Sequence, residues 1–245
     1  MRYDRDITPD GYKLICFHHA GGGASAFVEW QSCVKPGIEV IPVQLPGREN
    51  RMREGFLHSC GEAAEIVAAE LSDHLQSHNF SVFGHSMGGI IAFEAAKCFE
   101  KAGLQPDMCF ISATSITEKK EFIPTEKLSD DEFFERVALY GALDKESEIL
   151  QYPEFKEIFL KILRADFEMV EGYKDDGAVI KCPITAMCGR SDPMETIEMM
   201  KSWEKHTSGA FSVSEYDGGH FYLSESREKV CADISDIIRR CRDGG

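Results

Sequence analysis

Short apolar runs alternate along the chain with longer stretches in which apolar residues recur at helical spacing. The runs are rich in Ile, Val, Phe and Cys, which predicts buried strands; they cover residues 13–17, 38–43, 79–83, 107–113, 183–188 and 211–216. The longer stretches predict helices over residues 25–33, 60–77, 89–103, 194–206 and 225–241. This alternation favours βαβ crossovers and an α/β fold with a mostly parallel central sheet and helices on both faces.

The alternation stops over residues 114–181, where two helical stretches follow each other without a strand between them. The first begins at Ser129, whose hydroxyl can cap the helix together with the side chain of Glu132. The second covers residues 153–173 and is rich in Phe, Ile and Leu. We expect this insertion to form a helical lid over the strand ends, within one domain that spans residues 1–245. The alternative is that its apolar residues only pack helix against helix.

Composition and charge narrow the classes of function. The chain has 245 residues and a formal net charge of −15, so bulk binding to nucleic acid or to an anionic membrane is not expected. No apolar run approaches the length of a membrane span and the N-terminus has no apolar signal core, so we expect a cytoplasmic protein. The nine cysteines are scattered without a C-x-x-C pair, which favours free thiols over disulfides or a zinc site.

The segment Gly84-His85-Ser86-Met87-Gly88 connects a predicted strand to a predicted helix. It has the G-x-S-x-G pattern of a nucleophile elbow, a sharp turn that holds a serine hydroxyl in the open. The glycines leave room for the strained turn, and the N–H of Met87 is aimed toward an oxyanion that forms on an attacked carbonyl. The alternative is a glycine-rich turn that contains a serine by chance.

A second glycine-rich segment, residues 18–24, follows the first predicted strand. It lacks the glycine spacing of a dinucleotide-binding loop and the G-K-[ST] ending of a phosphate-binding loop. With Ser86 downstream, it fits better the HGGG-type loop that completes an oxyanion hole, with the backbone N–H of Ala20 as the donor. No third metal ligand accompanies His18 and His19 at helical spacing, so we interpret both as structural and predict no metal site.

The residues Ser86, Asp192 and His220 follow the order nucleophile, acid and histidine that is typical of an α/β-hydrolase. Each comes directly after a predicted strand, and the carboxyl ends of parallel strands share one edge of the sheet. His220 would act as general base and general acid toward Ser86, while Asp192 would hold the imidazole in the correct tautomer. Asp217 is the rival acid, but it lies in the same loop as His220, which makes the far ring nitrogen harder to reach.

With these residues in place, the chain resembles the type II thioesterases, the stand-alone editing thioesterases of nonribosomal peptide and polyketide synthases. The matching segments are CFHHAGGG at 16–23, LPGRE at 45–49, GHSMGG at 84–89, LSDDEF at 128–133, LRADF at 163–167 and GGHFYL at 218–223, so the resemblance spans nearly the whole chain. One departure is His18, where the family usually has proline. The resemblance implies an α/β-hydrolase fold with a helical lid.

The resemblance also implies a serine thioester hydrolase without a cofactor of its own. Its substrate would be a stalled or aberrant acyl group on the 4′-phosphopantetheine arm of an acyl or peptidyl carrier-protein domain. The implied partner is that carrier domain, and we expect the enzyme to be a monomer. Arg48 forms a small basic cluster with Arg51 and Arg53, which we interpret as a contact for the carrier or for the phosphate of the arm. A solvated loop is the alternative for Arg51 and Arg53.

Other functions remain open from the sequence. A general carboxylesterase, or an acyltransferase in which a second substrate displaces water, could use the same fold and the same three residues. Preference for acyl-carrier thioesters over oxygen esters separates a thioesterase from an esterase, and analysis of the products identifies a transferase. A non-catalytic subunit that keeps the fold is disfavoured by the intact set of Ser86, Asp192 and His220.

Overall fold

The computed structural model describes residues 11–116, 123–139 and 152–243. Its centre is a six-stranded sheet with the order β2-β1-β3-β4-β5-β6, in which every neighbouring pair is parallel. The strands are β1 (Tyr12–Phe17), β2 (Ile38–Pro42), β3 (Phe80–His85), β4 (Cys109–Ser112), β5 (Ile184–Gly189) and β6 (Phe211–Tyr216). The predicted α/β fold is confirmed, and each predicted strand is present.

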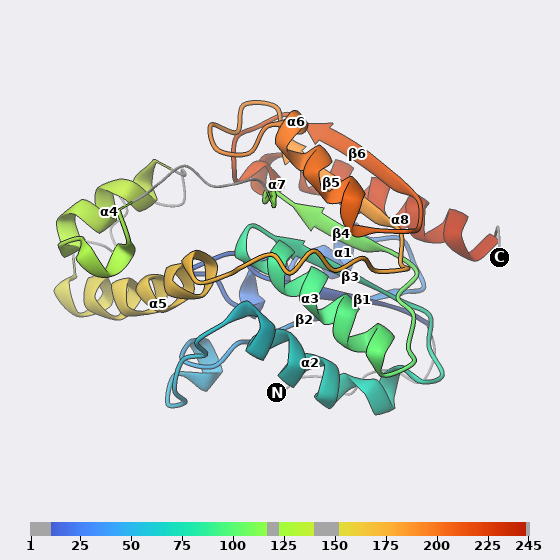
Figure 1. Ribbon diagram of the computed structural model, residues 1–245, viewed down its shortest axis with the longest axis horizontal. Coiled ribbons are helices and arrows are strands. Elements are labelled where there is room, and N and C mark those ends of the chain that lie inside the picture. Colours follow the sequence, from blue (N-terminus) through green and yellow to red (C-terminus); the bar gives the residue numbers. More distant parts are fainter. Residues whose placement is uncertain (1–10, 117–122, 140–151, 244–245) are drawn as a thin grey trace.

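Helices cover both faces of this sheet (Figure 1). They are α1 (Trp30–Cys33), α2 (Cys60–Leu75), α3 (Met87–Lys101) and α8 (Arg227–Asp243). Ile15 and Phe17 of β1 belong to one hydrophobic cluster with α2 and α3. Leu14 and Cys16 belong to a second cluster, with α1 and α8. Successive side chains of a strand point to opposite faces, so a strand covered on both sides is apolar at every position, which explains the continuous apolar runs of the sequence.

Two of the predicted helices are not continuous α-helices in the structure. Residues 25–33 contain a 3₁₀ helix (Ala24–Phe27) and the short α1, and residues 194–206 contain α6 (Ile197–Met200) followed by a 3₁₀ helix (Lys201–His206). In the second segment, Met200, Trp203 and His206 are buried. Their spacing of three matches the three residues per turn of a 3₁₀ helix, so burial of this stripe favours the tighter winding.

Two helices, α4 (Asp130–Ala138) and α5 (Pro153–Glu171), lie in the chain between β4 and β5. Both extend past the carboxyl ends of the strands (Figure 1). They share a hydrophobic cluster of their own, which consists of Phe133, Val137, Leu160 and Leu163. Ser129 caps α4 in a capping box with Glu132, as predicted. These helices belong to the segment 114–181 that we expect to act as a lid, of which residues 117–122 and 140–151 lie outside the described part.

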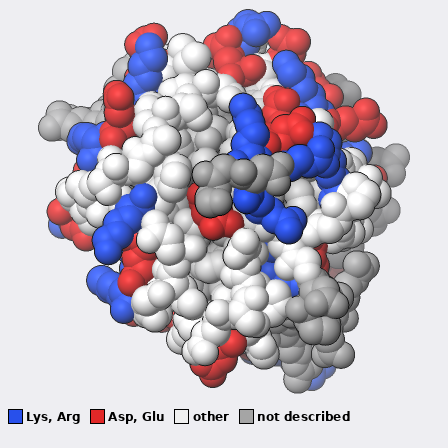
Figure 2. Space-filling view, turned by 90° about the vertical axis from the view of Figure 1, so that its right-hand side faces the viewer, with Lys and Arg blue, Asp and Glu red and all other residues white. Residues whose placement is uncertain are grey.

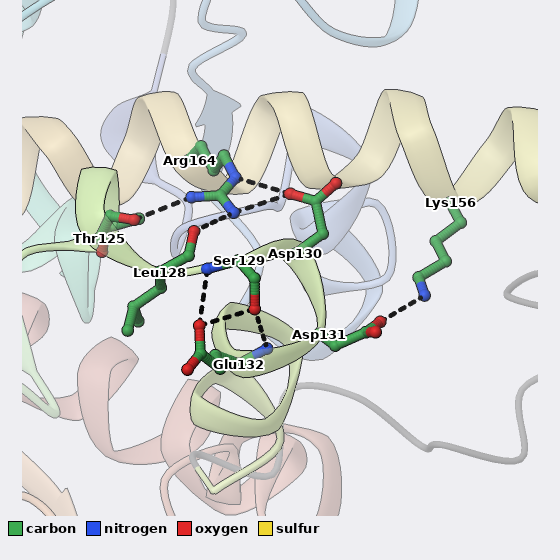
Figure 3. Close-up of polar contacts among 8 residues, drawn as sticks. All are labelled: Thr125, Leu128, Ser129, Asp130, Asp131, Glu132, Lys156 and Arg164. Carbon is green, nitrogen blue, oxygen red and sulfur yellow. Dashed lines mark hydrogen bonds and ion pairs between the residues drawn. The ribbon is translucent and has the colours of Figure 1, made fainter.

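Arg164 connects α5 to the start of α4 (Figure 3). Its guanidinium donates to the carbonyl oxygen of Thr125 at 2.8 Å and to that of Leu128 at 2.9 Å. It also pairs with the Asp130 carboxylate, at 2.7 Å from Nη2 and 3.1 Å from Nε. One arginine therefore fixes the start of α4 against the middle of α5.

The surface at the end of the molecule away from α4 and α5 is mixed in charge. Figure 2 shows Lys and Arg side chains interspersed with Asp and Glu there, with wide uncharged areas between them. The net charge of −15 is therefore not concentrated in one acidic patch on this face. Within the described ranges, none of the helices combines the length and the apolar character needed to cross a bilayer.

Candidate active site

The turn between β3 and α3 presents the Ser86 side chain at the carboxyl edge of the sheet. Ser86 has φ 55° and ψ −119°, a strained conformation for a residue with a side chain. A Cβ atom on Gly84 would lie 1.8 Å from the Gly88 carbonyl oxygen, and one on Gly88 would lie 2.2 Å from that of Phe17. The Ser86 N–H donates to the carbonyl oxygen of Ser112 at 2.7 Å and so holds the turn. The strand, tight turn and helix predicted around the G-x-S-x-G segment are confirmed.

The structure brings together the three residues that the sequence singles out. His220 Nε2 lies 3.1 Å from Ser86 Oγ, and His220 Nδ1 lies 2.8 Å from Asp192 Oδ2. Because an ionised carboxylate only accepts hydrogen bonds, His220 carries its proton on Nδ1 and leaves Nε2 free to accept from the serine hydroxyl. The second oxygen of Asp192 accepts from the N–H groups of Met194 and Glu195, at 2.8 and 3.2 Å. The carboxylate is thus fixed on both oxygens, and its His220 partner is fixed in turn.

Close packing of two loops explains why Asp192 rather than Asp217 reaches His220. β5 and β6 are neighbours, and a Cβ atom on Gly189 at the end of β5 would lie 2.1 Å from the carbonyl oxygen of Gly219. This contact presses the loop that bears Asp192 against the loop that bears His220. Asp217 instead forms an ion pair with Arg190, and its side chain is 83% exposed.

The two predicted oxyanion donors lie in the turn after β3 and in the loop after β1. Met87 is the first residue of α3, where a backbone N–H has no partner inside the helix. Ala20 lies in the loop after β1, the strand that pairs with β3 through Phe17 and Gly84. Within the described ranges, neither N–H donates to another backbone carbonyl. The two N–H groups are therefore candidate donors to an oxygen atom of a substrate.

Arg48 is buried, not on the surface where a contact with a carrier protein requires it. It is 3% exposed, and its two terminal nitrogens donate to the carboxylate of Asp166 on α5 at 2.6 and 2.7 Å. Asp166 also accepts from the N–H of Gly21 at 2.7 Å, and Arg48 donates to the carbonyl oxygen of Gly22 at 3.2 Å. Arg48 thus forms a structural ion pair between the loop after β2 and α5, and both of its members also contact the loop after β1. Asp166 lies in the matched segment 163–167, but no local pattern in the sequence marks it as the partner of Arg48.

Three further histidines surround the triad, and burial keeps them neutral. Burial and the nearby Arg48 guanidinium lower the pKa of His18 to about 3. Burial, with the nearby imidazoles of His220 and His19, lowers the pKa of His85 well below its usual range. His85 Nδ1 lies 2.8 Å from Ser112 Oγ. Neutral imidazoles place no positive charge beside His220. They therefore do not disfavour the imidazolium that forms when His220 takes the proton of Ser86.

Acidification is expected to destabilise the protein through these histidines. The unfolded chain binds protons at histidine near pH 6.5, whereas folded His18 binds its proton only near pH 3, so stability rises with pH between these values. The free energy of unfolding in urea should fall between pH 6.5 and pH 5 by up to about 1.4 kcal/mol per pH unit for each such histidine. His18→Asn removes one of these groups and should show a smaller fall. An equal fall in both proteins would contradict this prediction.

Comparison with known proteins gives a consistent assignment. The family model for the thioesterase domain matches residues 12–238. Gramicidin S biosynthesis protein GrsT of Aneurinibacillus migulanus is 38% identical over 235 residues, which cover 93% of this chain and 89% of GrsT. The structure of RedJ, a thioesterase from the prodiginine pathway in Streptomyces coelicolor, has a TM-score of 0.82 at 33% identity and covers 92% of this chain and 85% of that one. The structure of BorB, the type II thioesterase from the borrelidin biosynthetic cluster, has a TM-score of 0.81 at 31% identity and covers 97% of this chain and 95% of that one. The chain therefore belongs to the thioesterase family, with an α/β-hydrolase fold, and is a type II thioesterase of nonribosomal peptide and polyketide biosynthesis.

Proposed function

We propose that Ser86 is the nucleophile, His220 the general base and acid, and Asp192 the carboxylate that orients the imidazole. The observation that carries this proposal is the continuous line of hydrogen bonds from Asp192 through His220 to Ser86. Ser86 Oγ attacks the carbonyl carbon of a thioester while its proton passes to His220 Nε2, and Asp192 stabilises the imidazolium. The negative charge that forms on the carbonyl oxygen is bound by the N–H groups of Ala20 and Met87.

The remaining steps return the enzyme to its starting state. Collapse of the tetrahedral intermediate breaks the carbon–sulfur bond, leaves the acyl group on Ser86, and lets His220 deliver its proton to the departing sulfur. A water molecule then attacks the acyl-serine ester while His220 takes a proton from it. A second collapse releases the carboxylic acid, and His220 returns a proton to Ser86 Oγ. Each proton transfer uses His220 Nε2, the nitrogen that faces Ser86 in the structure.

The proposed substrate is a stalled or aberrant acyl group on the 4′-phosphopantetheine arm of a carrier-protein domain. Similarity to GrsT, named for gramicidin S biosynthesis, and to BorB of a borrelidin cluster supports this substrate. The helices α4 and α5 extend beyond the strand ends where Ser86 lies, and a long, flexible arm suits a site behind such an insertion. We propose that the enzyme works as a cytoplasmic monomer that meets carrier domains one at a time.

The test is hydrolysis of acetyl and longer acyl groups from a phosphopantetheinylated carrier protein. The rate is measured as the release of free thiol from the carrier. The proposal predicts a kcat/KM at least about tenfold higher for the acyl-carrier than for an oxygen ester of the same acyl group. The matched control is the same assay with Ser86→Ala. Faster hydrolysis of the oxygen ester would instead favour a general carboxylesterase. Appearance of the acyl group on a second acceptor, in place of the free acid, would favour an acyltransferase.

A further inference from the structure

The peptide group between His19 and Ala20 has one end in the proposed oxyanion hole and the other end fixed by the protein. In a trans peptide the C=O and the following N–H point in opposite directions. The N–H is that of Ala20, the proposed donor to the oxyanion. The carbonyl oxygen is that of His19, and it accepts a hydrogen bond from the N–H of Gly22 at 3.0 Å. Whatever holds this oxygen therefore also sets the direction of the Ala20 N–H.

The His18 imidazole provides a second hold on the same oxygen. His18 Nδ1 lies 2.8 Å from the His19 carbonyl oxygen. A carbonyl oxygen only accepts hydrogen bonds, so this contact requires the proton of the neutral imidazole to be on Nδ1. Burial and Arg48 lower the pKa of His18 to about 3, so the ring remains neutral at ordinary pH. The donor is thus present in a single tautomer over the pH range in which the triad can work.

The surroundings of His18 leave its ring little freedom. The residue is 1% exposed, and among the described residues its Nε2 atom has no hydrogen-bond partner. The backbone at this position is confined as well, because a Cβ atom on Gly88 would lie 2.7 Å from the His18 carbonyl oxygen. A buried ring nitrogen without a partner is unfavourable, so packing alone would favour an apolar side chain here. The polar contact that the ring does make is the one to His19.

We propose that His18 is a positioning residue, which holds the His19–Ala20 peptide so that the Ala20 N–H points at the oxyanion beside Ser86. This inference rests on the proposed function, because it takes the Ala20 N–H as an oxyanion donor. The rest of the loop is held from the other side, since Asp166 accepts from Gly21 N–H at 2.7 Å. His18 thus completes, from within the core, a set of contacts that fixes successive peptide groups of the loop.

Two substitutions separate positioning from simple packing. His18→Leu fills a similar volume but removes the donor, whereas His18→Asn places a side-chain N–H near the position of the imidazole Nδ1. An oxyanion contact strengthens in the transition state, so its loss lowers kcat and leaves KM unchanged. With an acyl-pantetheine thioester, we expect His18→Leu to lower kcat about 10- to 30-fold, less than the 10²–10³-fold loss of a whole donor, because Gly22 still holds the carbonyl. His18→Asn should stay within about threefold of the wild type.

A second measurement, the affinity for a transition-state analogue, separates a loss of oxyanion binding from a loss of folded enzyme. Affinity for a trifluoromethyl ketone, which forms a tetrahedral adduct with the serine, should fall in His18→Leu by the same factor as kcat, and be restored in His18→Asn. Equal kcat values for the Leu and Asn variants, or a rise in KM with kcat unchanged, would overturn the inference. Inactive Ser86→Ala beside a fully active His18→Leu would overturn this inference alone. Activity in Ser86→Ala would overturn the proposed function and the inference together.

Discussion

Ser86→Ala is expected to lower kcat for thioester hydrolysis by a factor on the order of 10⁴–10⁶, with little change in stability. The substitution removes the only atom that His220 Nε2 can activate in the triad, at 3.1 Å. The alanine keeps the turn intact, because the hydrogen bond that holds the turn is donated by the backbone N–H of residue 86 to the carbonyl oxygen of Ser112. The residual rate would come from binding and from the oxyanion donors acting on water.

The measurement is a single-turnover assay of acyl-carrier hydrolysis, in which the acyl-serine is trapped in the wild type. Ser32→Ala is the matched control, because Ser32 is an exposed serine of α1 whose hydroxyl contacts the nearby Glu29 carbonyl and Cys33. The control should leave kcat unchanged. If folded Ser86→Ala kept more than about a thousandth of the wild-type kcat, Ser86 could not be the nucleophile.

Asp166→Leu is expected to lower the free energy of unfolding by about 3–5 kcal/mol. The side chains of Arg48 and Asp166 are 4% and 1% exposed, so removal of the carboxylate leaves a buried guanidinium without its counter-charge. The N–H of Gly21 loses its acceptor in the same step. Activity should fall as well, because the loop of residues 18–24, which carries the proposed donor Ala20, loses its hydrogen bond to α5. Urea unfolding at pH 7 measures the first effect, and kcat at a temperature where the variant is folded measures the second.

The double variant Arg48→Met/Asp166→Leu is the control for the charge. It replaces both ionised groups with apolar side chains of similar size, which in buried pairs is often close to neutral for stability. We expect it to recover most of the lost stability, so the effects of the two substitutions should be strongly non-additive. Activity should stay low, because the N–H of Gly21 is still without its acceptor and the carbonyl oxygen of Gly22 now also loses its Arg48 donor. A double variant as unstable as Asp166→Leu would show that the buried charge is not the cause.

The triad could be predicted from the sequence because its members are marked by local patterns. A strand followed by a sharp turn is recognisable within about ten residues, and parallel strands bring such turns to one edge. The ion pair of Arg48 with Asp166 could not be predicted in this way, because its partners are 118 positions apart in the chain and lie on a loop and a helix. The basic cluster around Arg48 predicts a surface contact, because the sequence does not show that Asp166 of α5 pairs with Arg48 in the interior.

The choice between an α-helix and a 3₁₀ helix could not be predicted from the local sequence pattern either. The stretch 194–206 carries apolar residues at a spacing compatible with either winding, and packing of Met200, Trp203 and His206 decides for the tighter one. The contact between His18 and the His19 carbonyl was also hidden, because the sequence shows two adjacent histidines and not the direction of a peptide group.

The inserted helices α4 and α5 are held by ion pairs of unequal burial. α5 is joined to the sheet domain through a fully buried ion pair, whereas the Arg164–Asp130 contact that ties α4 to α5 has side chains that are 28% and 66% exposed. Water and salt weaken the second contact much more than the first. The insertion is therefore held by a buried ion pair at α5 and by a water-exposed ion pair at the start of α4. α5 cannot move outward without breaking this ion pair and releasing the N–H of Gly21 from the Asp166 carboxylate.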